Sequence, residues 1–275
     1  MQFSNQTLVV TGSSSGIGAA TVSLALSTGA EVHAVDIVAP STTREPGRHD
    51  HQCDLADPDS IARLTASLPE IDAVLNCAGI PNGGRFDPVS IMKVNWLGLR
   101  LLTESLIHRL RPEGSIVHVG STAGRDWALN AQWHNELMAA TSFDDGLKWV
   151  EDHLDLIGDG YGFSKQAVQY YTVWRSVQLL RLQIRMNCVN PGVTDTNLVS
   201  DFRAGVGNDV IDHAVAVAGR MATPQEMAPA ILFLADRASS AYITGVNLNV
   251  DRGTGAARAT NQSDPATIWA NHGHR

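Results

Sequence analysis

The sequence predicts a single α/β domain built on a doubly wound parallel β-sheet flanked by helices. Short β-branched runs alternate with helix-length segments, the strand-like runs are continuously apolar, and a glycine-rich turn joins the first strand to the first helix. A chain of 275 residues can bury a large enough core for one such domain. The expected strands are residues 7–10, 31–35, 72–75, 115–119, 185–189 and 246–250, and the clearest expected helices are residues 17–28, 94–110, 164–180 and 224–234.

The first expected strand runs directly into a glycine-rich loop with the sequence Thr-Gly-Ser-Ser-Ser-Gly-Ile-Gly, which ends at Gly18 and opens a helix. In such a loop the glycines allow a tight turn, close approach of the backbone to a pyrophosphate, and close packing of helix on strand. A helix N-terminus also favours phosphate through its free N–H groups and its dipole. We therefore expect a Rossmann-type dinucleotide site and not merely a tight turn. Its expected contacts are Gly12, Ser14, Ser15, Gly16, Ile17 and Gly18.

The choice of nicotinamide cofactor depends on Asp36, which ends the second expected strand 18 residues after Gly18. A carboxylate at about this spacing bonds the adenosine ribose hydroxyls. A ribose 2′-phosphate would meet a like charge, and neither the serines at 13–15 nor Ile37 offers a compensating cation. The sequence therefore predicts NAD and not NADP, unless Asp36 is an ordinary acid at a strand end.

Composition and charge exclude several other classes of protein. The net charge is −8 and Lys and Arg form no clustered run, which argues against nucleic-acid binding. No apolar stretch approaches a membrane span, and the start of the chain shows no signal peptide, so we expect a cytoplasmic protein without a membrane partner. Three separated cysteines also fit a reducing compartment.

A metal site is not expected, although one segment has suitable residue types. His49, His51 and Cys53 alternate, so a strand would place all three on one face. No fourth ligand is evident, and a solvated loop is the simpler interpretation.

Two regions fall outside the regular alternation. Residues 124–160 contain half of the six tryptophans and are expected to form a helical insert, with Ser142 as an N-cap. The catalytic domain is expected to end at residue 251. The tail, residues 252–275, is rich in Gly, Ala and Asn, and we expect it to be extended or disordered.

Seven ordered motifs resemble those of the short-chain dehydrogenase/reductase family across almost the whole chain. Besides the glycine loop, they are Asp54-Leu55, Asn76-Cys-Ala78-Gly79, Val94-Asn95, Gly120-Ser121, Tyr161-x-x-x-Lys165 and Pro191-Gly192-Val193-Thr194-x-Thr196. The chain is most similar to the bacterial 3α-hydroxysteroid dehydrogenase/carbonyl reductase and coniferyl-alcohol dehydrogenase types, because 40 residues separate Ser121 from Tyr161. Two departures are Cys77 in place of a second asparagine and Arg252 in place of a glycine.

The resemblance implies an oxidoreductase with the catalytic residues Asn95, Ser121, Tyr161 and Lys165. Tyr161 would be the acid/base, Ser121 would bond the substrate oxygen, and Asn95 would hold a water that links Lys165 to solvent. An ordinary tyrosine has a pKa of about 10, so Lys165, one helical turn away, is expected to lower the pKa of Tyr161. The resemblance also implies cofactor contacts from Asp54, Leu55, Asn76, Ala78, Gly79, Tyr161, Lys165, Pro191, Gly192, Val193, Thr194 and Thr196.

The expected substrate is a bulky apolar secondary, benzylic or allylic alcohol, or its carbonyl. Aromatic side chains of the insert could wall its cleft or simply pack the insert onto the domain. The candidates are Trp127, Trp133, Phe143 and Trp149. A dinucleotide-binding sensor without catalysis and an NADPH-linked biosynthetic ketoreductase are the alternatives.

Many relatives form tetramers partly by pairing the helix that carries the tyrosine with the same helix of a second subunit. Here the insert comes directly before that helix and is expected to cover its pairing face. We therefore expect a homodimer, or a homotetramer whose contacts avoid this helix.

Overall fold

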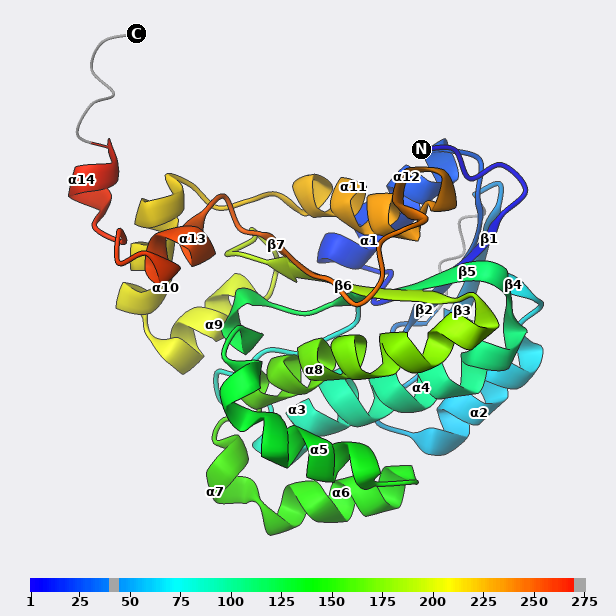
Figure 1. Ribbon diagram of the computed structural model, residues 1–275, viewed down its shortest axis with the longest axis horizontal. Helices are drawn as coiled ribbons and strands as arrows, with labels where there is room; N and C mark the ends of the chain where they lie inside the picture. Colours follow the sequence, from blue (N-terminus) through cyan, green and yellow to red (C-terminus); the bar gives the residue numbers. More distant parts are fainter. Residues whose placement is uncertain (40–44, 270–275) are drawn as a thin grey trace, which may run out of the picture.

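The computed structural model describes residues 1–39 and 45–269, which form a parallel seven-stranded sheet covered on both faces by helices (Figure 1). The strand order is β3-β2-β1-β4-β5-β6-β7, which confirms the expected doubly wound fold. The strands are β1 (Thr7–Thr11), β2 (Glu31–Asp36), β3 (Arg48–Gln52), β4 (Ile71–Asn76), β5 (Leu110–Val119), β6 (Arg185–Pro191) and β7 (Asn247–Val250). The principal helices are α1 (Gly16–Ser27), α2 (Pro58–Ser67), α3 (Pro88–Met92), α4 (Leu99–Leu106), α8 (Tyr161–Leu179), α11 (Pro224–Ala235) and α12 (Arg237–Ser240).

Alternate residues of the central strands bury against opposite helical layers. In β1, Val9 packs in the core on the side of α4 and α8, whereas Leu8 and Val10 pack on the side of α1 and α11. Trp96 and Tyr171 are fully buried in the first core, and Phe3 and Ile231 are fully buried in the second. Burial on both faces explains why these strands read as continuous apolar runs.

The edge strand β3 was not expected, because its sequence, Arg-His-Asp-His-Gln, carries no apolar residue. The interpretation of this segment as a solvated loop is therefore wrong. His51 Nε2 lies 2.9 Å from Nδ1 of His33 on the neighbouring strand, and His49 Nε2 lies 2.8 Å from Glu31 Oε2. Within the described residues, no group of three or more His, Cys, Asp or Glu side chains could hold a metal ion.

The helix expected over residues 94–110 starts earlier and is interrupted. It begins at α3, passes through a π-helical turn over Lys93–Gly98, continues as α4 and ends in a 3₁₀ turn over Ile107–Arg109. Leu110 is not helical but opens β5. The π-turn contains Asn95, and such turns are frequent at functional sites.

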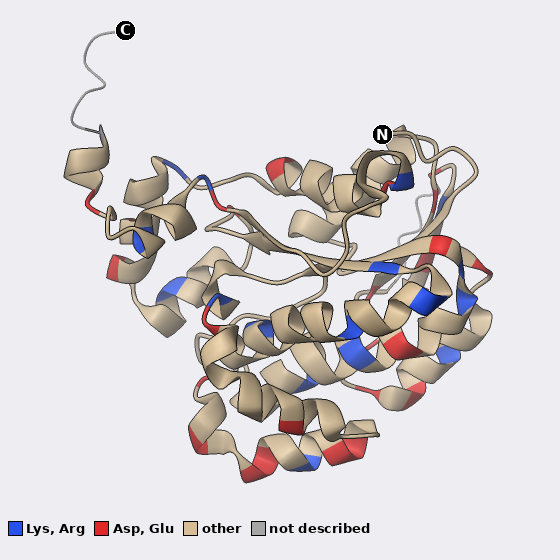
Figure 2. Ribbon diagram, in the orientation of Figure 1, with Lys and Arg blue, Asp and Glu red and all other residues tan. Residues whose placement is uncertain are grey.

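The insert is helical, as expected, and consists of α5 (Ala131–Ala139), α6 (Phe143–Asp152) and α7 (Leu154–Ile157). Ser142 caps α6 by accepting a hydrogen bond from the Asp145 N–H at 3.0 Å. Hydrogen bonds from Asn130 to Gln166 and from Tyr170 to Asn135 hold the insert on α8. Figure 2 shows acidic residues along α6 and α7, on the side away from the sheet.

The tail is not an extended or disordered arm over the residues that the structure describes. It forms α13 (Thr254–Ala259) and α14 (Pro265–Trp269), and both contact α10 (Asn208–Ala218), which follows α9 (Val199–Val206). The Asp251 carboxylate starts α13 by accepting the N–H groups of Gly253 at 2.9 Å and Gly255 at 2.7 Å. Residues 270–275 of the expected tail lie outside the described residues.

No helix in the described part of the chain is long and apolar enough to cross a membrane.

Candidate active site

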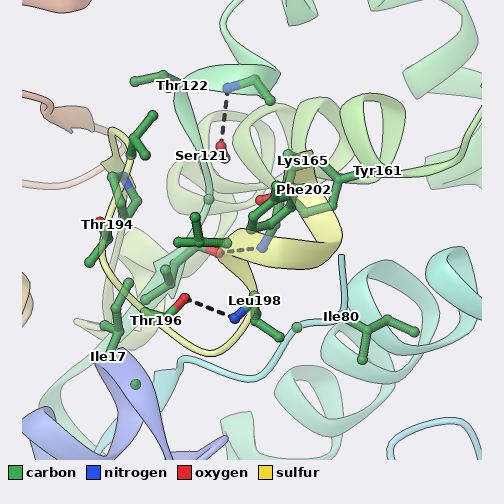
Figure 3. A pocket seen from close by; sticks show the side chains of 18 of the residues that line it. Ile17, Ile80, Ser121, Thr122, Tyr161, Lys165, Thr194, Thr196, Leu198 and Phe202 are labelled. Carbon is green, nitrogen blue, oxygen red and sulfur yellow. Dashed lines mark hydrogen bonds between the residues drawn. The ribbon is translucent and has the colours of Figure 1, made fainter. Parts of the chain in front are cut away.

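A cavity of ≈ 830 Å³ lies at the carboxyl ends of the central strands (Figure 3). Its wall includes residues that immediately follow β1, β4, β5 and β6, such as Gly12, Cys77, Gly120 and Gly192. This is the crevice where open α/β sheets bind their ligands. The helices α9, α10 and α13 close the cavity on the side away from the sheet.

The glycine-rich loop forms one end of the cavity, and two of its positions have no room for a side chain. Gly12 has φ +68°, and a Cβ there would lie 2.8 Å from the backbone of Ala78. A Cβ on Gly18 would lie 2.0 Å from the carbonyl oxygen of Gly12, so α1 approaches the loop as closely as backbone allows. The α1 N-terminus thus presents free N–H groups to a shallow backbone cradle that fits a pyrophosphate.

Asp36 stands at the same end of the cavity, at the carboxyl terminus of β2. Its carboxylate accepts hydrogen bonds from the backbone N–H groups of Ser14 at 2.9 Å and Val38 at 3.1 Å. These two bonds fix the carboxylate beside the glycine loop. The fixed negative charge fits ribose hydroxyls and opposes a phosphate at that position.

Most of the other expected cofactor residues also line this cavity. They are Ser15, Gly16, Ile17, Asp54, Leu55, Ala78, Gly79, Tyr161, Lys165, Pro191, Gly192, Val193, Thr194 and Thr196. Ser14 and Asn76 are not in the wall. Ser14 acts through its N–H on Asp36, and the buried Asn76 side chain donates to Thr103 Oγ1 at 3.0 Å and lies 3.1 Å from His118 Nδ1, which ties β4 to α4 and β5.

The structure brings Ser121, Tyr161 and Lys165 together in the cavity wall. Ser121 follows β5, while Tyr161 and Lys165 come from the first two turns of α8. Lys165 Nζ donates to the Val119 carbonyl oxygen at 3.0 Å and lies 5.8 Å from the centre of the Tyr161 ring. Phe202 of α9 packs edge-on against that ring at 4.9 Å. These contacts fix Lys165 and the Tyr161 ring in the same part of the wall.

The expectation that Lys165 lowers the pKa of Tyr161 is wrong for the protein without a bound cofactor. Burial raises the pKa of Tyr161 to about 12; a hydrogen bond with Ser121 opposes this rise, and the Asp159 carboxylate adds to it. Burial also lowers the pKa of Lys165 to about 8. Desolvation is the largest cause of both shifts, so the phenol keeps its proton at neutral pH.

Asn95 lies behind the cavity wall, where it is fully buried. Its Oδ1 accepts from the Ile80 N–H at 2.8 Å, and its Nδ2 donates to the Ile80 carbonyl at 3.0 Å and to Ser164 Oγ at 3.3 Å. A Cβ on Gly79 would meet Asn95 Oδ1 at 3.3 Å and Lys165 Nζ at 3.4 Å, so both groups crowd the same glycine. Asn95 therefore lies near Lys165 without facing the cavity.

The aromatic residues of the insert do not wall the cavity. Trp133, Phe143 and Trp149 pack against the core formed with α4 and α8, and Trp127 packs edge-on against Tyr170 at 5.9 Å. Since the insert lies against the flank of α8, its large side chains turn toward that helix and bury there. The substrate role expected for these four residues is therefore corrected in favour of packing.

Sequence reasoning missed a further set of residues in the cavity wall. These come from α9, α10, α13 and the segment before α9, and include Leu198, Phe202, Val206, Val210, His213 and Arg258. Arg125, four residues after Ser121, also lines the cavity. No motif marks these positions. The only sequence signal is the four-residue interval between Leu198, Phe202, Val206 and Val210.

Comparison with known proteins assigns the chain to a family. Residues 6–132 match the sequence model described as short chain dehydrogenase, and residues 156–255 match one described as enoyl-(acyl carrier protein) reductase. A coniferyl-alcohol dehydrogenase from a Pseudomonas species is 37% identical over 258 residues, covering 92% of this chain and 98% of that protein. The chain belongs to the short-chain dehydrogenase family. The resemblance expected from the motifs is confirmed, and the protein is an oxidoreductase of this family.

Two further relatives also match this chain over almost their whole length. A cis-4-hydroxycyclohexanecarboxylate dehydrogenase from Sinomonas cyclohexanicum is 29% identical, covering 91% of this chain and 97% of that protein. The 3α-hydroxysteroid dehydrogenase from Pseudomonas sp. B-0831, solved as a complex with NADH, superposes with a TM-score of 0.78 at 26% identity and covers 92% of this chain and 98% of that chain. The backbone cradle at Gly12 and Gly18 fits the dinucleotide that this family binds.

Proposed function

We propose that the protein is an NAD-dependent alcohol dehydrogenase/carbonyl reductase in which Tyr161 is the acid/base. The observation that carries this proposal is the convergence of Ser121, Tyr161 and Lys165 in the wall of one cavity whose other end is the backbone cradle at Gly12. A bound nicotinamide would accept hydride from an alcohol carbon or deliver it to a carbonyl carbon.

The proton chemistry follows from the state of Tyr161. Its pKa of about 12 makes it a neutral phenol, ready to donate a proton to a carbonyl oxygen during reduction. In the oxidation direction the same oxygen takes the proton back from the alcohol. Ser121 Oγ donates a hydrogen bond to the oxygen on which negative charge develops. A positive charge beside the ring, from Lys165 or the oxidised cofactor, favours the phenolate needed for oxidation.

Lys165 and Asn95 are proposed to pass that proton to solvent. Lys165 is buried with a pKa of about 8, so it can lose and regain a proton near neutral pH. Asn95 lies next to it across Gly79 and within a π-helical turn. A water held there would connect the ammonium group to bulk solvent.

Asp36 supports the choice of NAD over NADP. Its carboxylate is fixed by two backbone N–H groups and lines the adenosine end of the cavity. We expect kcat/KM to be at least tenfold higher with NAD⁺ than with NADP⁺, a difference of about 1.4 kcal/mol. Asp36→Ala should narrow this ratio, chiefly by weakening NAD⁺ binding. Steady-state rates with each cofactor measure it, and equal rates in the wild-type protein would contradict the assignment.

The substrate class is proposed as an alcohol with an apolar aromatic or alicyclic body. Leu198, Phe202, Val206 and Val210 give the cavity an apolar wall, and Phe202 packs against the ring of the catalytic tyrosine. The relatives named for coniferyl alcohol, hydroxysteroid and hydroxycyclohexanecarboxylate oxidation act on ring-containing alcohols. A panel of aromatic, terpenoid, alicyclic and steroid alcohols, followed by NADH absorbance, tests this. Turnover confined to short aliphatic alcohols would overturn it.

A further inference from the structure

Two arginines line the same cavity as the catalytic side chains. Arg125 follows the 3₁₀ turn over Thr122–Gly124, directly after Ser121. Arg258 lies one helical turn after Thr254 on α13, and both residues face the cavity together with Gly255. The two arginines lie 133 residues apart in the sequence, and the fold brings both to the wall of this cavity.

Among the described residues, Arg258 has no carboxylate partner and Arg125 has only one long ion pair, to an exposed carboxylate. The guanidinium of Arg258 makes no ion pair or hydrogen bond with any described residue. Arg125 Nη1 donates to the Thr122 carbonyl at 2.8 Å, and its Nε lies 3.6 Å from the exposed carboxylate of Asp126. Its Nη2 group has no hydrogen-bond partner among the described residues. Both guanidiniums thus keep N–H groups available for a ligand.

The two positive charges lie close enough to interact. Burial and, after it, the field of Arg258 lower the pKa of Arg125, while Asp126 opposes the shift. Like charges held together are unfavourable unless an anion joins them. The chain as a whole carries a net charge of −8, so a generally basic surface does not explain why two arginines line this cavity.

The remainder of the cavity wall restricts the source of such an anion. Asp36 and Asp54 line the cavity beside the glycine loop, where the adenosine of a cofactor is expected, and Asp209 lines the α10 side without pairing with either arginine. The facing wall is apolar, with Val206 and Val210. An anion attached to an apolar body matches this arrangement better than a free inorganic ion.

We propose that Arg125 and Arg258 together bind a carboxylate carried by the alcohol substrate, at the end remote from the reacting carbon. This inference rests on the proposed alcohol dehydrogenase function and adds the chemical class of the substrate. The planar guanidinium offers paired N–H groups that match the two oxygens of a carboxylate. The Asp251 carboxylate positions Arg258, because it fixes the start of α13 through two N–H groups.

The test compares benzylic alcohols that bear a para carboxylate with their neutral carboxamides, which have nearly the same shape. In the wild-type protein at saturating NAD⁺, kcat/KM should be at least tenfold higher for the carboxylates, or about 1.4 kcal/mol. Arg125→Gln and Arg258→Gln should each bring that ratio close to one. Arg181→Gln, an exposed arginine outside the cavity wall, is the matched control and should keep the ratio.

Two kinetic outcomes would overturn the inference. One is an equal kcat/KM for carboxylate and carboxamide in the wild-type protein, or a preference that survives both substitutions. The other is a rise in the KM for NAD⁺ in both variants, by the same factor with every alcohol, which would show that the arginines bind the phosphates of the cofactor.

A binding measurement separates this inference from the proposed function. Calorimetry with para-toluate, which has no hydroxyl group to oxidise, uses the full-length protein saturated with NADH. Binding that weakens at least tenfold in Arg258→Gln supports the carboxylate site, even if no alcohol is turned over and the proposed function fails. Turnover of neutral alcohols with no binding of para-toluate overturns the carboxylate site alone.

Discussion

The ionisation of the catalytic tyrosine is set by its immediate neighbours. Burial raises the pKa of Tyr161, Ser121 lowers it through a hydrogen bond, and Asp159 raises it through its charge. The Asp159 carboxylate also accepts the Tyr161 N–H at 3.0 Å and the Asn82 amide at 2.5 Å. Asp159 therefore positions the start of α8 and biases Tyr161 toward its protonated form, without touching the reacting atoms.

Asp159→Asn should shift the pH dependence of alcohol oxidation to lower pH. Removing the negative charge favours the phenolate, so the pKa of Tyr161 falls. The rise of kcat/KM with pH should then occur at lower pH, by up to about one pH unit. The asparagine keeps an acceptor for the Tyr161 N–H. The measurement is kcat/KM against pH, with the exposed Asp155→Asn on α7 as the control. A profile that does not move would show that Asp159 is only structural.

The motifs predicted which residues meet at the site but not their electrostatic state. The spacing of Tyr161 and Lys165 places them on one helix face, which is visible in the sequence. The degree of burial of both groups depends on α9 and on the strands behind them, which no local pattern encodes. That burial, and not the i, i+4 spacing, decides the direction of both pKa shifts.

At the scale of elements, the closest approach in the cofactor site is between α1 and the loop before it. A Cβ on Gly18 would lie 2.0 Å from the Gly12 carbonyl oxygen, and neither backbone can yield without moving α1. Gly18→Ala should therefore weaken NAD⁺ binding at least tenfold and reduce the free energy of unfolding by about 1–3 kcal/mol. Calorimetric NAD⁺ titration and urea denaturation measure the two effects.

Gly162→Ala is the control for that substitution. A Cβ on Gly162, within α8, meets no atom within 4 Å. Alanine there should leave NAD⁺ binding intact and raise helix stability by about 0.5–1 kcal/mol. Similar NAD⁺ affinities in Gly18→Ala and the wild-type protein would contradict the proposed role of the cradle.

Some elements were predictable from their patterns and others were not. Central strands such as β4 and β6 are buried on both faces, so apolar runs mark them. The edge strand β3 is polar throughout, as edge strands often are, and leaves no such signal. The tail helices α13 and α14 are only six and five residues long, too short for an amphipathic period.

At the scale of the whole molecule, the insert changes which surfaces are free to meet a second copy. Asn130 and the helix α5 that follows it contact α8 at Gln166 and Tyr170, so part of the helix that carries the catalytic tyrosine is covered. The strand β7 is an edge of the sheet, and Asn249 on it is exposed. An unpaired strand edge is suited to pairing with the same edge of another copy.

We therefore propose a homodimer that forms through β7 and its neighbour α11, or a homotetramer whose contacts avoid α8. Light scattering should give the mass of a dimer or tetramer. Asn249→Cys on β7 should form an intersubunit disulfide under mild oxidation, whereas Val177→Cys on α8 should not. Efficient crosslinking through Val177→Cys would show that α8 is accessible to a second subunit. That result would contradict the proposal that the insert prevents contacts through this helix.

The most direct test of the account is the turnover of Tyr161→Phe with NAD⁺ and a ring-containing alcohol that the wild-type protein oxidises. The substitution keeps the ring that packs against Phe202 and removes only the titrating hydroxyl. We expect kcat to fall by about 10²–10⁴-fold while the Kd for NADH stays within about twofold. Tyr170→Phe, on the same helix but outside the cavity wall, should retain its activity. A Tyr161→Phe protein that keeps more than about a tenth of the wild-type kcat would contradict the assignment of Tyr161 as the acid/base.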